Sequence, residues 1–209
     1  MNEQFCKPLT AYIRQSVNLT ENEAELIEKQ SRVVTFTKGS LLAEEGFHSR
    51  SVYFILSGQA RSYYLDEQGK SITWFFHFNE SFSTAKNLFV TDYKSLLTNT
   101  PGTLTIEALT DITAVQLSFS GLEHLLNGMP AFGTWMRKLN ESFFIVIYDR
   151  IFTLMTMTAQ QRYEQMLHDE PHLLQMFSNH YLASYLGLAP QSLSRIKSTV
   201  SHSHLAVAV

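Results

Sequence analysis

The spacing of the apolar residues constrains the fold of this chain more than any other feature of its sequence. From Arg32 to Leu117 apolar and polar residues alternate with a period of two, which is the period of a β-strand. On either side of this region the period is close to that of an α-helix. Four glycines at turn spacing divide the first half of the β region into short runs: Gly39, Gly46, Gly58 and Gly69. Short strands without helices between them predict a closed or double-sheet β-domain.

We therefore predict an α+β fold made of three successive segments. Residues 1–128 form an N-terminal β-barrel of the double-stranded β-helix, or jelly-roll, type, with flanking helices. Residues 129–157 form one long dimerisation helix: Gly128 and Pro130 end the short helix before it, and residues 132–157 contain no proline and no glycine after Gly133. Residues 158–209 form an all-α helix-turn-helix domain.

The long helix carries more apolar surface than one neighbour can cover. Its apolar residues form two adjacent stripes, each with the three- and four-residue spacing of a helix–helix seam. One stripe can cover the barrel, and the other is left for a second copy of the chain. The residues expected at this twofold dimer interface are Phe144, Ile147, Ile151 and Leu154. The alternative is a single wide face that is buried within one subunit.

Residues 179–198, NHYLASYLGLAPQSLSRIKS, have the residue sizes that a helix-turn-helix demands. Ala183 stands where the two helices touch, and Gly187 stands at the turn, where a positive φ is needed. Pro190 suits the first turn of the second helix. The outer face of that helix then carries side chains that can bind base edges and phosphates: Gln191, Ser192, Ser194, Arg195 and Lys197. A purely structural helical hairpin with the same spacing is the alternative.

Charge and hydropathy limit the classes of protein to which this chain can belong. The formal net charge is −3, which argues against a nucleic-acid partner, but residues 171–209 contain no acidic side chain. The fixed cations there are Arg195 and Lys197, a modest footprint for an anionic partner. The longest apolar run, Phe143–Tyr148, is too short to span a bilayer, and no secretory signal is visible. We therefore expect a cytoplasmic protein with no membrane partner.

No arrangement of residues predicts an enzyme. The chain lacks a nucleophile elbow, a phosphate-binding loop and a zinc-protease motif. A metal-dependent barrel enzyme needs a close pair of histidines, whereas the β region holds only His48 and His77, far apart in the sequence. The single cysteine, Cys6, excludes an intramolecular disulfide or a cluster held by several cysteines. We expect no catalytic residues and no metal site.

The order of elements resembles the CRP/FNR family of bacterial transcription regulators, whose barrel is a cyclic-nucleotide-binding-like domain. The motifs that carry the resemblance are FTKGSLLAEEG at 36–46, SVYFILSGQARSYYLDEQGK at 51–70, ALTDITAVQLS at 108–118 and the segment 161–197. The chain looks most like the short members of the family from Bacteroidetes-type bacteria. The resemblance implies a homodimer that binds an inverted repeat in double-stranded DNA, with RNA polymerase as a further partner.

The chain departs from the cyclic-nucleotide-binding members of the family at the phosphate-binding cassette. Where those members have an F-G-E element, this chain reads Phe78-Asn79-Glu80, and the position of their phosphate-binding arginine falls on Gly102. Without that arginine, cyclic AMP is not expected as the effector, and the identity of any small-molecule effector stays open. The residues expected near such an effector are Phe78, Glu80, Phe82 and Thr103. A solvent-facing Glu80 is the alternative.

Two functions are therefore open from the sequence. The first is a sequence-specific DNA-binding transcription regulator of the CRP/FNR type. The second is a ligand-binding or scaffold module whose helix-turn-helix is degenerate and does not bind DNA. Many family members follow the recognition helix with a β-hairpin wing, and the nine residues after Val200 are too few for one.

Overall fold

The computed structural model describes residues 3–206, and the side chains of residues 6–200. The chain forms two compact units. The first comprises Met1–Tyr64 and Phe75–Val146, and the second comprises Leu65–Trp74 and Ile147–Val209. This division differs from the three segments expected from the sequence, because its boundary lies inside the long helix and because a short β segment belongs with the C-terminal helices.

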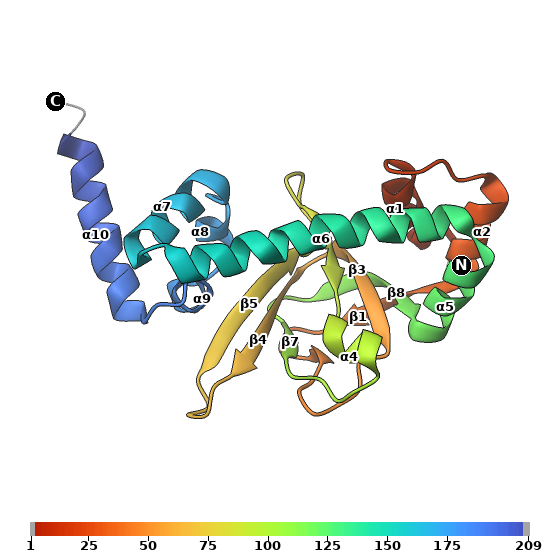
Figure 1. The fold of residues 1–209 in the computed structure, drawn as a ribbon, viewed down its shortest axis with the longest axis horizontal. Helices are drawn as coiled ribbons and strands as arrows, with labels where there is room; N and C mark the ends of the chain where they lie inside the picture. Colours follow the sequence, from red (N-terminus) through yellow and green to blue (C-terminus); the bar gives the residue numbers. More distant parts are fainter. Residues whose placement is uncertain (1–2, 207–209) are drawn as a thin grey trace. The chain divides into compact units, whose positions relative to one another are not determined.

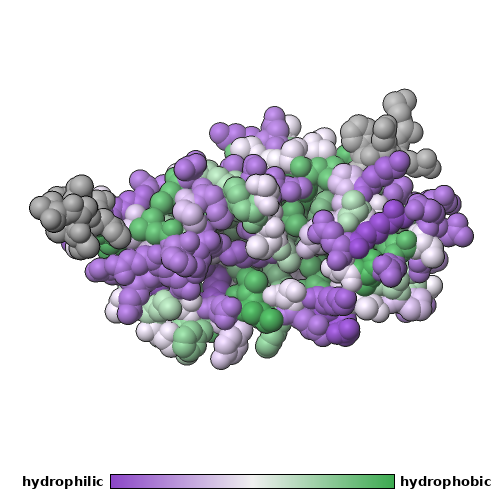
Figure 2. Space-filling view, turned by 90° about the horizontal axis from the view of Figure 1, so that it is seen from above, coloured by the Kyte–Doolittle hydropathy of each residue, from purple (hydrophilic) through white to green (hydrophobic). Residues whose placement is uncertain are grey.

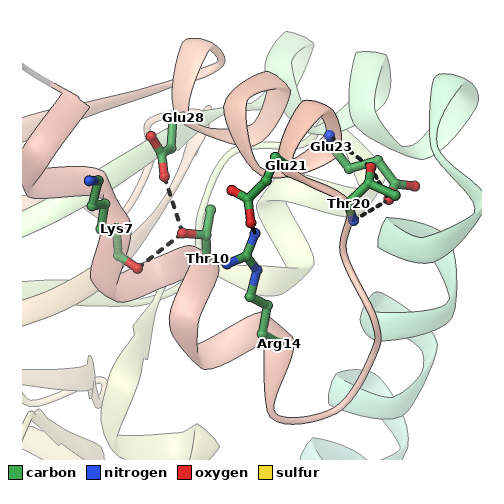
Figure 3. A network of polar contacts seen from close by, with 7 residues as sticks. All are labelled: Lys7, Thr10, Arg14, Thr20, Glu21, Glu23 and Glu28. Carbon is green, nitrogen blue, oxygen red and sulfur yellow. Dashed lines mark hydrogen bonds and ion pairs between the residues drawn. The ribbon is translucent and has the colours of Figure 1, made fainter.

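Two helices begin the first unit, α1 (Glu3–Arg14) and α2 (Glu21–Lys29). Figure 3 shows the polar contacts that fix them. At the start of α2, the Thr20 hydroxyl accepts a hydrogen bond from the Glu23 amide, and the Glu23 carboxylate accepts one from the Thr20 amide. This capping box satisfies two donors that a helix start leaves free. The Thr10 hydroxyl of α1 donates to the carboxylate of Glu28 on α2, at 3.2 Å.

The β region folds into two four-stranded sheets, with strand orders β1-β8-β3-β6 and β2-β7-β4-β5 (Figure 1). The strands are β1 (Ser31–Phe36), β2 (Leu41–Ala43), β3 (Ser51–Ser57), β4 (Gln59–Leu65), β5 (Ser71–Phe78), β6 (Phe89–Val90), β7 (Thr105–Ala108) and β8 (Ile112–Ser118). Strand β8 pairs antiparallel with both β1 and β3. The predicted jelly-roll domain is confirmed, as a sandwich of two sheets rather than a closed barrel.

Successive residues of β3 point into two different apolar cores. Phe54 belongs to a core shared with helices, which includes Trp135 of the long helix. Its neighbour Ile55 belongs to a second core that also contains Ala60 and Ile106, from the other sheet. This division follows from the pleat, which directs alternate side chains to opposite faces of a strand. The interior of the sandwich is thus filled by aliphatic side chains, several of them small.

Three short helices complete the first unit: α3 (Ala85–Leu88), α4 (Tyr93–Thr98) and α5 (Phe119–Gly128). Asp92 caps α4 by accepting the amide hydrogen of Ser95 at 3.0 Å. Gly58 connects β3 to β4 with φ +95°, and a Cβ there would lie 2.3 Å from the backbone oxygen of Asp111. Only glycine fits this turn.

The long helix α6 (Pro130–Thr156) begins in the first unit and ends in the second. It is followed by α7 (Ala159–Asp169), α8 (Leu173–Met176), α9 (Asn179–Tyr185) and α10 (Pro190–Ala206). These last four helices bury apolar side chains against one another, among them Tyr163, Leu173, Leu182 and Leu193. Within residues 3–206, no helix combines the length and the hydrophobicity that a membrane span requires.

Candidate functional site

Helices α9 and α10 form a helix-turn-helix with the geometry predicted from residue size. Ala183 is completely buried, and Gly187 lies in the turn with φ +69°. Pro190 is the first residue of α10, where its missing N–H costs no hydrogen bond. The Ser178 hydroxyl caps α9 by accepting the Tyr181 amide. The sequence therefore located both helices and the turn between them.

The second helix presents a polar face to solvent. Leu193 is buried, and Ile196 is half-buried on the inner face. The exposed polar residues on its outer part are Gln191, Ser192, Ser194 and Arg195. Many members of the CRP/FNR family have a β-hairpin wing after the recognition helix. In this chain α10 instead continues as a helix to Ala206.

Lys197 has a different environment from Arg195. Its side chain is half-buried, and its Nζ donates a hydrogen bond to the Oδ1 of Asn179 at the start of α9. Partial burial lowers the pKa of Lys197 from its usual range. The contact ties the middle of α10 to the first residue of α9. Reasoning from the sequence missed Asn179, which differs from the other polar residues of this segment only through this long-range contact.

Two arginines hold the C-terminal end of α9. Arg150 of α6 donates to the backbone oxygen of Tyr185 at 2.9 Å, and Arg162 of α7 donates to that of Leu186 at 2.8 Å. Helix C-termini carry free carbonyl groups and a partial negative charge, so both cations are well placed there. Arg162 also donates to the backbone oxygen of Met157, just after α6. These contacts fix α9 directly before the Gly187 turn.

The tip of the β4–β5 hairpin belongs to the same unit as the helix-turn-helix. The hydroxyl of Ser184 on α9 accepts the Thr73 amide at 2.8 Å and donates to the Ser71 oxygen at 2.9 Å. Arg150 donates to the Thr73 oxygen at 3.2 Å, and its guanidinium lies 5.2 Å from the ring centre of Trp74. One serine and one arginine thus bind α9 to the backbone of this strand.

Helix α6 carries a stripe of exposed large apolar side chains. Hydrophobic residues reach the surface among hydrophilic ones on the face drawn in Figure 2. The exposed apolar residues of α6 are Phe144, Ile145, Tyr148, Ile151, Phe152 and Met155. Four of them repeat at alternating spacings of four and three residues: Phe144, Tyr148, Ile151 and Met155. This is the spacing of a helix–helix seam.

The four residues expected at a dimer interface divide between two environments. Phe144 and Ile151 are exposed, at 68% and 45%. Ile147 and Leu154 are half-buried, and a Leu154 methyl lies 3.5 Å from the position that a Cβ on Gly187 would occupy. Leu154 thus packs beside the helix-turn-helix turn within its own unit. Tyr148 and Met155 take the corresponding places in the exposed stripe.

The residues expected near an effector have different environments. Phe78 is completely buried, with its ring centre 6.0 Å from that of Phe82. Glu80 is exposed, as its alternative interpretation predicted. Thr103 is exposed as well, and its amide donates to the Oδ2 of Asp92 at 3.1 Å. The structure therefore brings Phe78 and Phe82 together, whereas Glu80 and Thr103 are exposed to solvent.

Gly102, at the position of the phosphate-binding arginine, is enclosed by its neighbours. A Cβ there would lie 2.7 Å from the Oδ2 of Asp92 and 3.1 Å from the backbone oxygen of Phe47. A side chain at this position would therefore displace either a carboxylate or a backbone segment. The carboxylate of Asp92 also places negative charge beside this position, which opposes the binding of a phosphate.

A buried histidine, His77 of β5, lies apart from the exposed side chains. Its Nε2 is 3.0 Å from the hydroxyl oxygen of Ser62 on β4. Burial lowers the pKa of His77 to about 4, because the charged imidazolium would lose its hydration. In the part of the chain whose side chains are described, no group of three or more His, Cys, Asp or Glu side chains is placed to hold a metal ion.

Comparison with known proteins identifies the class to which this fold belongs. Residues 33–128 match the family model of the cyclic nucleotide-binding domain. FixK2 from Bradyrhizobium japonicum is 19% identical, with a TM-score of 0.69, over 83% of this chain and 86% of that one. No protein with a curated description matches. Residues 33–128 carry this match, and the long helix α6 and the helix-turn-helix lie outside it.

The same fold is found in other solved structures. A CooA variant from Carboxydothermus hydrogenoformans is 16% identical, with a TM-score of 0.66, over 91% of this chain and 83% of that one. A transcriptional regulator of the crp/fnr family from Eubacterium rectale is 16% identical, with a TM-score of 0.64, over 88% and 85%. The predicted resemblance is confirmed: this chain has the fold of the CRP/FNR transcription regulators.

Proposed function

We propose that this chain is a homodimeric, sequence-specific DNA-binding transcription regulator. The observation that carries the proposal is the outer face of α10, where Gln191, Ser192, Ser194 and Arg195 are exposed on a helix whose inner face is packed. A well-packed second helix with free polar side chains is what major-groove reading requires. Gln can pair with adenine through two hydrogen bonds, and Arg can pair with guanine in the same way.

The exposed stripe of α6 supports the homodimer. Phe144, Tyr148, Ile151 and Met155 would otherwise leave a row of large apolar side chains in water. A twofold axis along this stripe would bury it against the same residues of a second copy. Such a dimer would present two copies of α10 to an inverted repeat, with half-sites about one helical turn apart. RNA polymerase is the further partner that a regulator of this class would contact.

The effector in this proposal is not cyclic AMP. Gly102 has no room for an arginine, and Asp92 presents a carboxylate at the same place. Burial of a cyclic phosphate there without a cation would cost several kcal/mol of binding free energy. A loss of about 1.4 kcal/mol already lowers the affinity tenfold. Calorimetry with cyclic AMP and cyclic GMP should therefore show no micromolar binding. No catalytic or metal chemistry is part of the proposal.

Selection from random double-stranded DNA with the purified full chain tests the proposed function. Enrichment of an inverted repeat is expected, and Arg195→Ala should remove or alter the enriched sequence. Lys38→Ala is the matched control, because Lys38 is an exposed cation far from the helix-turn-helix in the sequence and outside its unit. If the wild-type chain enriches no sequence, the second function, a ligand-binding or scaffold module with a degenerate helix-turn-helix, is correct instead.

A further inference from the structure

The first unit contains a pocket with a volume of about 300 Å³ that the proposed function does not use. It lies between β2, the loop of residues 44–50 and Asp92, which precedes α4. The lining side chains that matter for its chemistry are Phe47, His48, Arg50, Tyr53, Glu44 and Asp92. The sequence predicts Phe78, Glu80, Phe82 and Thr103 near an effector, and none of these four lines this pocket.

Backbone hydrogen bonds hold the loop of this pocket in one shape. The Gly46 amide donates to the Gly102 oxygen at 2.9 Å, and the Gly102 amide donates to the Phe47 oxygen at 2.8 Å. The Ser49 amide donates to the hydroxyl of Ser95 at 2.9 Å. The loop is therefore fixed through its main chain, while the side chain of Phe47 is 65% exposed. Binding residues often lie on loops that a rigid scaffold holds in place.

The pocket places charges of both signs within one small volume. Asp92 is 2% exposed, and its carboxylate accepts two backbone hydrogen bonds. No side chain among the described residues forms an ion pair with Asp92. Arg50 and His48 are exposed, and within the same part of the chain neither side chain has a hydrogen-bond or ion-pair partner. Glu44 adds a second, exposed carboxylate to the lining.

We propose that this pocket binds a small zwitterion of the α-amino-acid type. The buried carboxylate of Asp92 would take the ammonium group, and the guanidinium fork of Arg50 would take the carboxylate. The rings of Phe47 and Tyr53 would contact the apolar part of the ligand. A ligand of a single charge would leave either Arg50 or Asp92 facing a like charge, whereas a zwitterion satisfies both.

The volume of the pocket agrees with this class of ligand. It lies at the lower end of the range of about 300–1,000 Å³ for small-molecule sites. The phosphate of a nucleotide in this pocket would face the carboxylate of Asp92, which has the same sign of charge. The proposal concerns binding alone and stands whether or not the chain binds DNA.

Calorimetry with the purified full chain tests the proposal, using the common α-amino acids one at a time. For the amino acid that binds most tightly, two analogues are then compared: the amine that lacks the carboxylate, and the acid that lacks the amino group. We expect the amino acid to bind at least about tenfold more tightly than either analogue. No binding of any amino acid at millimolar concentration would overturn the proposal, as would equal binding of the amino acid and its analogues.

A substitution of Arg50 separates the proposed site from binding elsewhere. Arg50→Gln should lower the affinity for the amino acid by at least about tenfold, because the ligand carboxylate loses its partner. The variant should then bind the amino acid no more tightly than its amine analogue. Lys38→Gln, an exposed cation of the same unit that does not line the pocket, should change neither affinity. Arg50 is exposed, so this variant should fold normally. Wild-type affinity of Arg50→Gln for the amino acid would place the binding site elsewhere.

Asp92 provides the second half of the test. Asp92→Asn retains a good helix cap for α4, because Asn and Asp cap equally well. The variant should have a lower affinity for the amino acid, and an unchanged or higher affinity for the acid analogue that lacks the amino group. An unchanged preference for the amino acid over the acid would show that Asp92 does not hold the ammonium group. If Asp92→Asn does not fold, the Arg50→Gln comparison alone decides the proposal.

Discussion

The guanidinium of Arg150 lies 4.0 Å from the ring centre of Tyr185, and its Nη2 donates a hydrogen bond to the backbone oxygen of the same tyrosine. The Tyr185 hydroxyl in turn donates to the carboxylate of Glu170 at 3.0 Å. Burial lowers the pKa of Arg150 and raises that of Tyr185. A single buried cation thus joins α6 to α9, the first helix of the helix-turn-helix.

Replacement of Arg150 should therefore destabilise the second unit. Arg150→Met fills a similar volume but leaves the oxygens of Thr73 and Tyr185 without this donor, which costs about 2–3 kcal/mol in the free energy of unfolding. Urea denaturation measures the change. Arg137→Met, on an exposed part of the same helix, is the control and should change stability by less than about 0.5 kcal/mol. Equal losses for both variants would mean that the contacts of Arg150 contribute no net stability.

His77 should make the stability of the chain depend on pH. Its pKa is about 4 in the folded state and about 6.5 when unfolded, so the unfolded state binds more protons between these values. The stability is complete above about pH 6.5 and falls as the pH drops toward 4, by about 2 kcal/mol at pH 5. Urea denaturation at pH 7 and pH 5 measures this loss.

The control for this effect is His77→Gln, which keeps a polar group beside Ser62 but does not titrate. The difference in unfolding free energy between pH 7 and pH 5 should be smaller in this variant by about 2 kcal/mol. An undiminished difference would assign the acid sensitivity to other groups.

Charges placed in the exposed stripe of α6 should break the proposed dimer. Phe144→Asp combined with Ile151→Asp would put four carboxylates into a twofold interface, and monomers are expected in light scattering. Leu97→Asp, at an apolar residue of α4 that is 63% exposed, should leave the dimer intact. A wild-type dimer mass for the double variant would place the interface elsewhere.

Arg195 and Lys197 should have different roles on DNA. Arg195→Ala should cost about 1–3 kcal/mol per half-site and relax the preference at one base position, because its exposed side chain can reach a guanine. Lys197→Ala should weaken binding to all sequences alike and reduce the salt dependence. Titrations on the selected operator and its single-base variants measure both effects. Equal losses for Arg195→Ala on every variant would make Arg195 a backbone contact.

Gly102 should tolerate no side chain. Gly102→Ala would push a methyl group against Asp92 and the Phe47 backbone and should destabilise the first unit by about 1–3 kcal/mol. Gly133→Ala, in an open position of α6, should instead stabilise the chain by up to about 1 kcal/mol, because Ala favours the helix. Thermal unfolding of the two variants and of the wild-type chain measures these changes in stability. A neutral Gly102→Ala would show that Asp92 moves aside easily.

The sequence by itself determined the elements that depend on local chemistry. The change of apolar period located the β-sandwich between helical segments, since side-chain periodicity follows from strand and helix geometry. Ala183, Gly187 and Pro190 located the helix-turn-helix, because each meets a steric demand of its own position. These signals act within a few residues and need no knowledge of distant neighbours.

Only the tertiary structure decided which faces are covered and which side chains meet. Ile147 and Leu154 fit a helix seam as well as Tyr148 and Met155 do, and packing within the second unit decided that the latter pair is exposed. Asp92 and Gly102 are ten residues apart in the sequence, yet their contact removes the room for an arginine. Burial and pocket shape arise from segments that are distant along the chain, so no local pattern records them.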